Sequence, residues 1–134
     1  MSDSDAEARF RLGMSQLREI DRRLDEFEID DLSTRDVDAA VADLDAAIEG
    51  LSGLALGRAL LLRAHAADLR LTVTTFADAA AGKNFADIRR ENDSDNRWKQ
   101  AALQDAERGR DLVAAAGETT DLDWADRLIA LLKS

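Results

Sequence analysis

The sequence contains no cysteine and no proline, and aromatic residues make up only 4% of it. The absence of cysteine excludes disulfides, thiolate metal ligands and cysteine nucleophiles. The absence of proline leaves long helices uninterrupted, because no residue lacks its backbone N–H or clashes with the preceding turn. With so few aromatic residues, a core must be built mainly from alanine, leucine, valine and isoleucine. Hydrophobic residues reach 46% of the 134 residues, which is enough for such a core.

Basic residues are outnumbered, with 18 Lys and Arg against 28 Asp and Glu and a formal net charge of −10. An acidic surface repels the phosphate backbone, which argues against a general nucleic-acid binder. The same acidity fits either a high-salt cytoplasm or an acidic binding surface, and the sequence does not separate the two. The first residues show no basic region followed by an apolar stretch, so we expect no secretion signal and a cytoplasmic protein.

Apolar residues recur at steps of three and four along most of the chain, which is the period of an amphipathic helix. The predicted helices span residues 5–28, 34–51, 54–81, 94–116 and 121–133. Ser4 with Glu7 predicts a capping box at the first helix, Ser33 or Thr34 predicts the start of the second, and Gly82 the end of the third. Short connections favour antiparallel neighbours, so we expect a single all-α domain over residues 1–134.

The third predicted helix is unusual because its apolar residues lie on every side. A helix of this kind is buried on most faces, so it should be the central helix or should also face a second subunit. Its segment Leu69–Phe76 has some strand propensity, but the apolar run continues on both sides without a turn signal. The helix is long enough to span a bilayer, yet five ionisable side chains make it too costly for a lone membrane span. These side chains are Arg58, Arg63, His65, Asp68 and Arg70.

Small residues at helical spacing recur in two of the predicted helices, as Ala40-x-x-x-Leu44-x-x-Ala47 and as Ala102-x-x-x-Ala106-x-x-Gly109. An adjacent Leu-Gly pair occurs in two others, as Leu12-Gly13 and Leu56-Gly57. The arrangement resembles the tetratricopeptide (TPR) repeat, whose first helix carries Leu-Gly and whose second helix carries small residues. The resemblance implies two helix pairs with the last helix as a cap, and it implies peptide binding by the first helices.

The TPR pattern is incomplete in this sequence. The period of about 34 residues, the aromatic residues on either side of Leu-Gly and the terminal proline are all missing. A plain five-helix antiparallel bundle is therefore the other architecture that the sequence allows. In both architectures the third helix is long and central.

The stretch Glu91–Lys99, which reads ENDSDNRWK, is the most metal-like part of the chain. A calcium loop needs oxygen ligands at alternate positions, a glycine at the sixth position and a glutamate at the twelfth. Counted from Asp93, the fifth, sixth and twelfth positions are Arg97, Trp98 and Gln104, so the motif fails. The Asn, Asp and Ser side chains of this stretch are instead predicted to cap the fourth helix.

His65 is the only histidine, and without cysteine it cannot complete a zinc site or a di-iron motif. We therefore expect no metal and no cofactor. A lone histidine midway along a bundle helix is the arrangement of histidine phosphotransfer domains, but Asp68 would place a negative charge beside a phosphohistidine. The alternative is a structural histidine that pairs with Asp68 one turn on.

Arg58, Arg63 and Arg70 lie on the otherwise apolar third helix, and Arg63 and Arg70 are two turns apart on one face. Such arginines commonly reach water or pair with acids of neighbouring helices. Alternatively they line a groove that takes an acidic peptide segment or a carboxylate, which the TPR resemblance implies. These three arginines are the candidate binding residues.

The sequence thus predicts a non-catalytic protein–protein interaction module, either a TPR-like array or a helical-bundle adaptor, with a homodimer through the third helix as one form. We expect no enzyme activity, no nucleic-acid partner and no membrane partner. Two other functions stay open. One is a histidine phosphotransfer-type signalling bundle that uses His65, and the other is an acidic decoy that inhibits a basic site on its partner.

Overall fold

The computed structural model describes residues 3–26, 28, 32–82, 84, 86–87 and 97–133 of the chain. In these residues it contains five α-helices and no strand: α1 (Asp3–Asp25), α2 (Thr34–Gly50), α3 (Gly53–Ala80), α5 (Arg97–Ala115) and α6 (Thr119–Lys133). The all-α prediction is therefore confirmed. Each predicted helix is present, and the stretch that includes Leu69–Phe76 is helical.

The observed helix ends confirm the predicted caps at Ser33 and Gly82 and contradict the one at Ser4. Ser33 is the N-cap of α2, and its backbone N–H donates to Asp36 Oδ2 at 3.0 Å. Gly82 follows the end of α3 with φ of 87°, a left-handed conformation that only glycine adopts freely. Ser4, however, is not an N-cap, because α1 already begins at Asp3 and Ser4 lies inside its first turn. The predicted cap in residues 91–96 lies outside the described residues.

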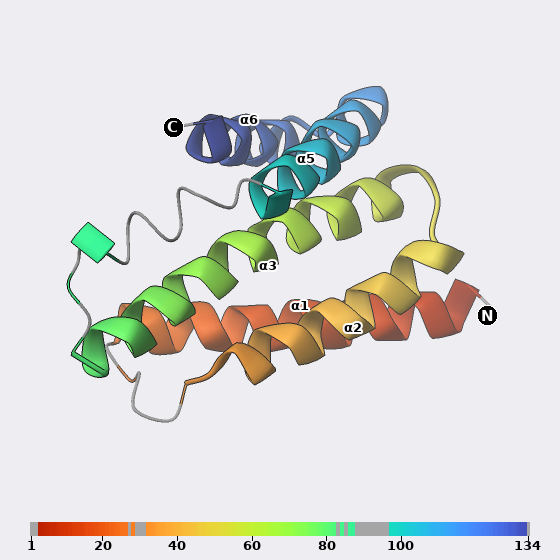
Figure 1. Ribbon diagram of the computed structural model, residues 1–134. Coiled ribbons are helices and arrows are strands. Elements are labelled where there is room, and N and C mark those ends of the chain that lie inside the picture. The colour runs from red at the N-terminus through yellow and green to blue at the C-terminus, as the bar shows by residue number, and fades with distance from the viewer. Residues whose placement is uncertain are drawn as a thin grey trace.

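Consecutive helices run antiparallel and stack in the order of the chain (Figure 1). Helices α1 and α2 form one pair, α3 crosses this pair, and α5 and α6 cover the opposite side of α3. Among the described residues, α1 and α6 do not pack on each other. Helix α3 is therefore the central helix, as its apolar residues on every side predict.

Two clusters of buried side chains make up the core, and α3 contributes to both. The first joins α1, α2 and one side of α3 through Leu17, Ile20, Val37, Ala40, Leu44, Ala66, Leu69 and Val73. The second joins the other side of α3 to α5 and α6 through Leu61, Ala64, Ala102, Ala106, Val113, Ala125, Leu128 and Leu132. Helices of its own chain therefore bury α3 on two sides, while Phe76 near its end is 39% exposed.

Glycines allow the helices within a pair to approach each other closely, both in α1–α2 and in α3–α5. A Cβ added at Gly13 would lie 2.9 Å from Leu44 Cγ, and one added at Gly57 would lie 2.9 Å from Leu112 Cβ. In the opposite direction, a Cβ on Gly109 would lie 2.8 Å from the backbone oxygen of Gly57. These spacings are shorter than ordinary van der Waals contact. The glycine of each Leu-Gly pair therefore lies at a close contact, of α1 with α2 and of α3 with α5.

Candidate functional site

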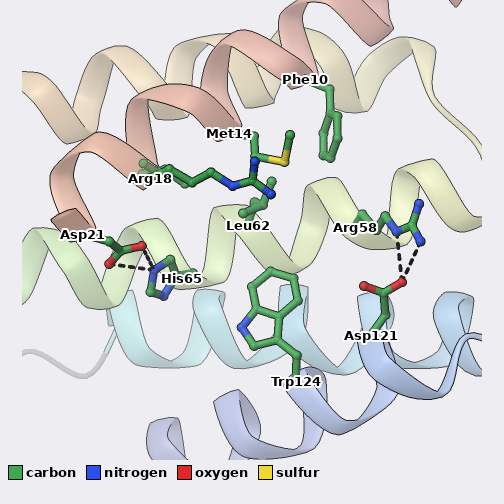
Figure 2. Close-up of a pocket in the computed structure, with 10 residues that line it drawn as sticks. Phe10, Met14, Arg18, Asp21, Arg58, Leu62, His65, Asp121 and Trp124 are labelled. Carbon is green, nitrogen blue, oxygen red and sulfur yellow. Dashed lines mark hydrogen bonds and ion pairs between the residues drawn. The ribbon is translucent and has the colours of Figure 1, made fainter.

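An open groove of about 670 Å³ lies over the face of α3 that is left between α1 and α6. It exists because α1 and α6 flank α3 without packing on each other. All of its lining residues come from these three helices: Phe10, Met14, Leu17, Arg18 and Asp21 of α1, Arg58, Leu62 and His65 of α3, and Asp121 and Trp124 of α6. Figure 2 shows these side chains around the groove.

The middle of the groove is apolar. Met14 and Leu17 come from the stripe of α1 that also supplies the core, and Leu17 is buried. Leu62 of α3 and Trp124 of α6 are half-buried and complete this surface. Methionine and tryptophan adapt well to apolar ligands, because thioether and indole groups are polarisable and make large contacts. The groove therefore offers a site for an apolar group.

Arg18 extends along the groove from α1, and its guanidinium lies beside Met14 and above Leu62 (Figure 2). Within the described part of the chain, no hydrogen bond or ion pair holds this guanidinium. Arg18 is not among the candidate binding residues predicted from the sequence, which all belong to the third helix. Its spacing four residues after Met14, next to the apolar stripe, is the signal that would have identified it.

Arg58 lies at one end of the groove, where it joins α3 to α6. Its guanidinium is 2.9 Å from Asp121 Oδ2 and 4.0 Å from a carboxylate oxygen of Glu118. The charges of Arg58 and Asp121 therefore largely cancel at this end. Of the three arginines named from the sequence, Arg58 is the one that lines the groove.

Arg63 and Arg70 bind carboxylates outside the groove. Arg63 donates through Nε and Nη2 to both oxygens of Asp105, at 2.7 and 2.8 Å, and through Nη1 to Asp45 at 3.1 Å. The bonds to Asp105 are the main reason that the pKa of Arg63 is raised. Arg70 Nε donates to Asp38 at 3.0 Å. Both arginines thus join α3 to neighbouring helices, in agreement with the predicted pairing of such arginines with acids of those helices.

His65 closes the other end of the groove. Its Nε2 lies 3.0 Å from Asp21 Oδ2, and its ring meets Trp124 edge-on, with 6.5 Å between the ring centroids and 72° between the planes. The single histidine therefore links α3 to α1 by a hydrogen bond and to α6 by an aromatic contact. The predicted hydrogen-bonding partner, Asp68, is wrong, because the side chain of α1 reaches His65 across the helix interface.

Asp68 is half-buried near this pair. Its pKa is raised, chiefly because burial disfavours the charged carboxylate; the electrostatic interaction with His65 lowers this pKa and that with Asp21 raises it. The carboxylates of Asp21 and Asp68 thus both lie near the imidazole. A phosphoryl group on Nε2 would have to displace Asp21 and would be repelled by both acids.

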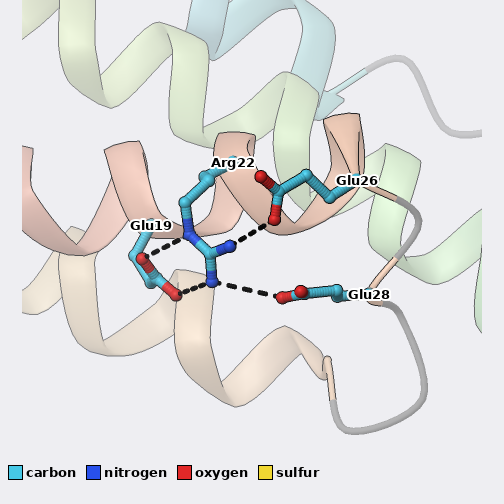
Figure 3. Close-up of polar contacts among 4 residues, drawn as sticks. All are labelled: Glu19, Arg22, Glu26 and Glu28. Carbon is cyan, nitrogen blue, oxygen red and sulfur yellow. Dashed lines mark hydrogen bonds and ion pairs between the residues drawn. The ribbon is translucent and has the colours of Figure 1, made fainter.

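A separate polar cluster lies at the exposed end of α1, away from the groove residues. Figure 3 shows Arg22 among three carboxylates, with Glu19 at 2.6 Å, Glu28 at 3.2 Å and Glu26 also paired. The hydrogen bonds that Arg22 donates to Glu19 raise the pKa of Arg22 and lower the pKa of Glu19. Arg22 occupies the space between these acids and fastens Glu28 to the last turns of α1. We therefore interpret this cluster as structural.

The described residues contain no group of three or more His, Cys, Asp or Glu side chains that would hold a metal ion. Nor does this part of the chain include a helix with the length and apolarity needed to cross a membrane. The groove is thus the described feature that combines apolar contacts with an unpaired charge.

Comparison with known proteins gives no relative for this chain. No protein-family model, no curated protein and no solved structure matches it. The TPR resemblance therefore stays a prediction, and the function has to be argued from the groove itself.

Proposed function

We propose that this protein is a non-catalytic interaction module and that the groove between α1, α3 and α6 binds a segment of a partner protein. The observation that carries the proposal is the lining of the groove. Apolar side chains from three helices line the groove, and the exposed guanidinium of Arg18, which has no partner among the described residues, lies in it. An apolar surface with a few well-placed polar groups is the usual composition of a ligand site.

The state of the ionisable residues supports recognition rather than catalysis. Asp21 is held by His65, and Asp121 is held by Arg58. A general acid or base must exchange a proton with its substrate, whereas these carboxylates already serve to fix the helices that form the groove. The same bond at His65 argues against the phosphotransfer alternative.

The helix order supports a TPR-like module within this proposal. If α1–α2 and α3–α5 are two repeats and α6 is the terminal helix, the groove is lined only by the first helix of each pair and by the terminal helix. Peptide binding by first helices is what the resemblance implies. Gly13 and Gly57, from the two Leu-Gly pairs, both occupy close helix contacts within a pair.

Two further parts of the proposal concern the setting of the protein. We place it in the cytoplasm, which the absence of cysteine supports. A homodimer stays a prediction, although α3 is already covered on two sides by its own chain. Light scattering distinguishes the two states, because the monomer has a mass of 14.7 kDa.

Selection from a displayed library of random peptides tests the proposal, followed by measurement of Kd for the selected peptides by fluorescence polarisation. Met14→Trp fills the groove and should weaken binding at least about tenfold, which corresponds to about 1.4 kcal/mol. Leu12→Trp is the matched control, because Leu12 is on the same helix, is 47% exposed and does not line the groove. Circular dichroism verifies that both variants fold. The proposal is wrong if no peptide binds, or if Met14→Trp binds as tightly as Leu12→Trp.

A further inference from the structure

The charges that face the groove differ in how they are compensated. Arg58 and Asp121 neutralise each other at one end, and Asp21 accepts a hydrogen bond from His65 at the other. Arg18 lies between these two ends and has no such partner in the described residues. A chain with a net charge of −10 thus presents an uncompensated, exposed cation beside the apolar middle of the groove.

Asp21 is the nearest candidate to neutralise Arg18, since it follows three residues later on α1. The two side chains nevertheless diverge: Figure 2 shows the guanidinium of Arg18 turned away from Asp21 toward Met14, while Asp21 is directed at His65. His65 therefore keeps Asp21 in place and leaves Arg18 available to a ligand.

We infer that the occupant of the groove carries one carboxylate beside an apolar group, and that Arg18 binds this carboxylate. The inference rests on the proposed function and specifies its ligand. A guanidinium donates two parallel N–H groups to the two oxygens of a carboxylate. A neutral amide or an ammonium group in the ligand cannot accept both of these hydrogen bonds. Met14, Leu62 and Trp124, which line the same groove, provide the contact for the apolar group.

The two ends of the groove limit the number of acidic groups in the ligand. Asp21 and Asp121 lie on either side of Arg18, and the side chain of Asp21 is 43% exposed. A run of acids would place a negative charge against Asp21 at a cost, and at the other end it would meet Arg58 and Asp121, whose charges largely cancel. The preferred ligand is therefore one acid flanked by apolar residues rather than an acidic tail. The carboxylate is therefore an aspartate or glutamate side chain within the segment.

A peptide array tests the inference with defined probes. The central position is Glu, Gln, Lys or a run of three Glu, the flanking positions are mixtures of Leu, Phe and Met, and each peptide is made with a free and with an amidated C-terminus. For amidated peptides we expect a single Glu to bind at least about tenfold more tightly than Gln, as removal of a charged hydrogen-bonding partner predicts. The run of three Glu should bind more weakly than the single Glu. If the free C-terminus, and not the central Glu, produces the gain, the inference of a side-chain carboxylate is overturned.

Charge reversal at Arg18 gives the matched comparison. Arg18→Glu should reverse the preference from Glu to Lys, whereas Arg35→Glu, the same change at an exposed residue of α2, should leave it unchanged. The inference is overturned if peptides with and without a carboxylate bind the wild-type protein equally tightly. If Met14→Trp abolishes that binding, the proposed function is left intact. If Met14→Trp does not weaken binding either, both the inference and the proposed function are wrong.

Discussion

His65 of α3 and Asp21 of α1 are joined by a hydrogen bond of 3.0 Å between Nε2 and Oδ2. The bond crosses the interface of α1 and α3 at one end of the groove. It therefore has two consequences: it fixes the distance between two helices that line the groove, and it keeps Asp21 away from Arg18. Both consequences lead to measurable predictions.

Removal of this bond should loosen α1. His65→Gln is expected to lower the free energy of unfolding by about 1 kcal/mol at pH 7, the usual net contribution of one hydrogen bond. In a double-mutant cycle with Asp21→Asn, measured by urea denaturation, the two effects should be clearly less than additive because they remove the same contact. Full additivity would show that His65 and Asp21 do not interact in solution.

Asp68 should limit stability at neutral pH. Its folded-state pKa is raised mainly by burial, so ionisation costs more in the folded than in the unfolded state. The cost is present above the folded-state pKa, falls as pH falls through that value, and is absent below the pKa of the unfolded chain. Asp68→Asn should therefore stabilise the protein at pH 7, by less than about 1 kcal/mol because water screens this half-buried group.

The pH dependence of that gain provides the control for Asp68→Asn. Urea denaturation at pH 7 and at pH 3 should give a stabilisation at the first pH that shrinks toward zero at the second, since both forms are then neutral at this position. A variant that is less stable than the wild type at pH 7 would mean that the attraction to His65 outweighs the cost of burial.

Arg63 and Arg70 should differ in their effect on stability although both are arginines of α3. Arg63 binds Asp105 with two hydrogen bonds and its side chain is only 31% exposed, whereas Arg70 makes one bond to Asp38 and is 54% exposed. We expect Arg63→Ala to cost about 1–2 kcal/mol and Arg70→Ala less than about 0.5 kcal/mol in thermal or urea unfolding. Equal effects would contradict the structural role assigned to Arg63.

Gly109 should be intolerant of alanine. Replacement of a helical glycine by alanine ordinarily adds up to about 1 kcal/mol of stability. Here the new Cβ would lie 2.8 Å from the backbone oxygen of Gly57 and 2.9 Å from Leu61 Cγ, so α3 and α5 would have to separate. Overpacking of this kind costs about 1–3 kcal/mol. Gly109→Ala should therefore lower the midpoint of urea denaturation, and a higher midpoint would show that the two helices are not in close contact.

The fold was predictable because the information for helices is local. The steps of three and four in α1 and the apolar surface of α3 follow directly from residue order. The start of α1 was less predictable, because the sequence does not show whether Ser4 caps the helix or lies inside its first turn. The end of α3 was clearer, since Gly82 adopts the left-handed conformation that favours glycine there.

The site was less predictable because it depends on which helix faces meet. His65 and Asp21 lie 44 positions apart, so no local pattern relates them. Arg58, Arg63 and Arg70 share a helix, yet their carboxylate partners lie on three different helices and direct them to different surfaces. Arg18 is significant only because α6 leaves the groove beside it open.

The chain offers a direct spectroscopic test of the groove because it has two tryptophans. Trp124 lines the groove, whereas Trp98 of α5 packs on the core on the other side of α3 and does not. In a ¹H–¹⁵N spectrum, titration with a peptide from the display selection should shift the indole N–H resonance of Trp124 and leave that of Trp98 unchanged. A shift of Trp98 alone, or of neither resonance at a saturating peptide concentration, would contradict binding in the groove between α1, α3 and α6.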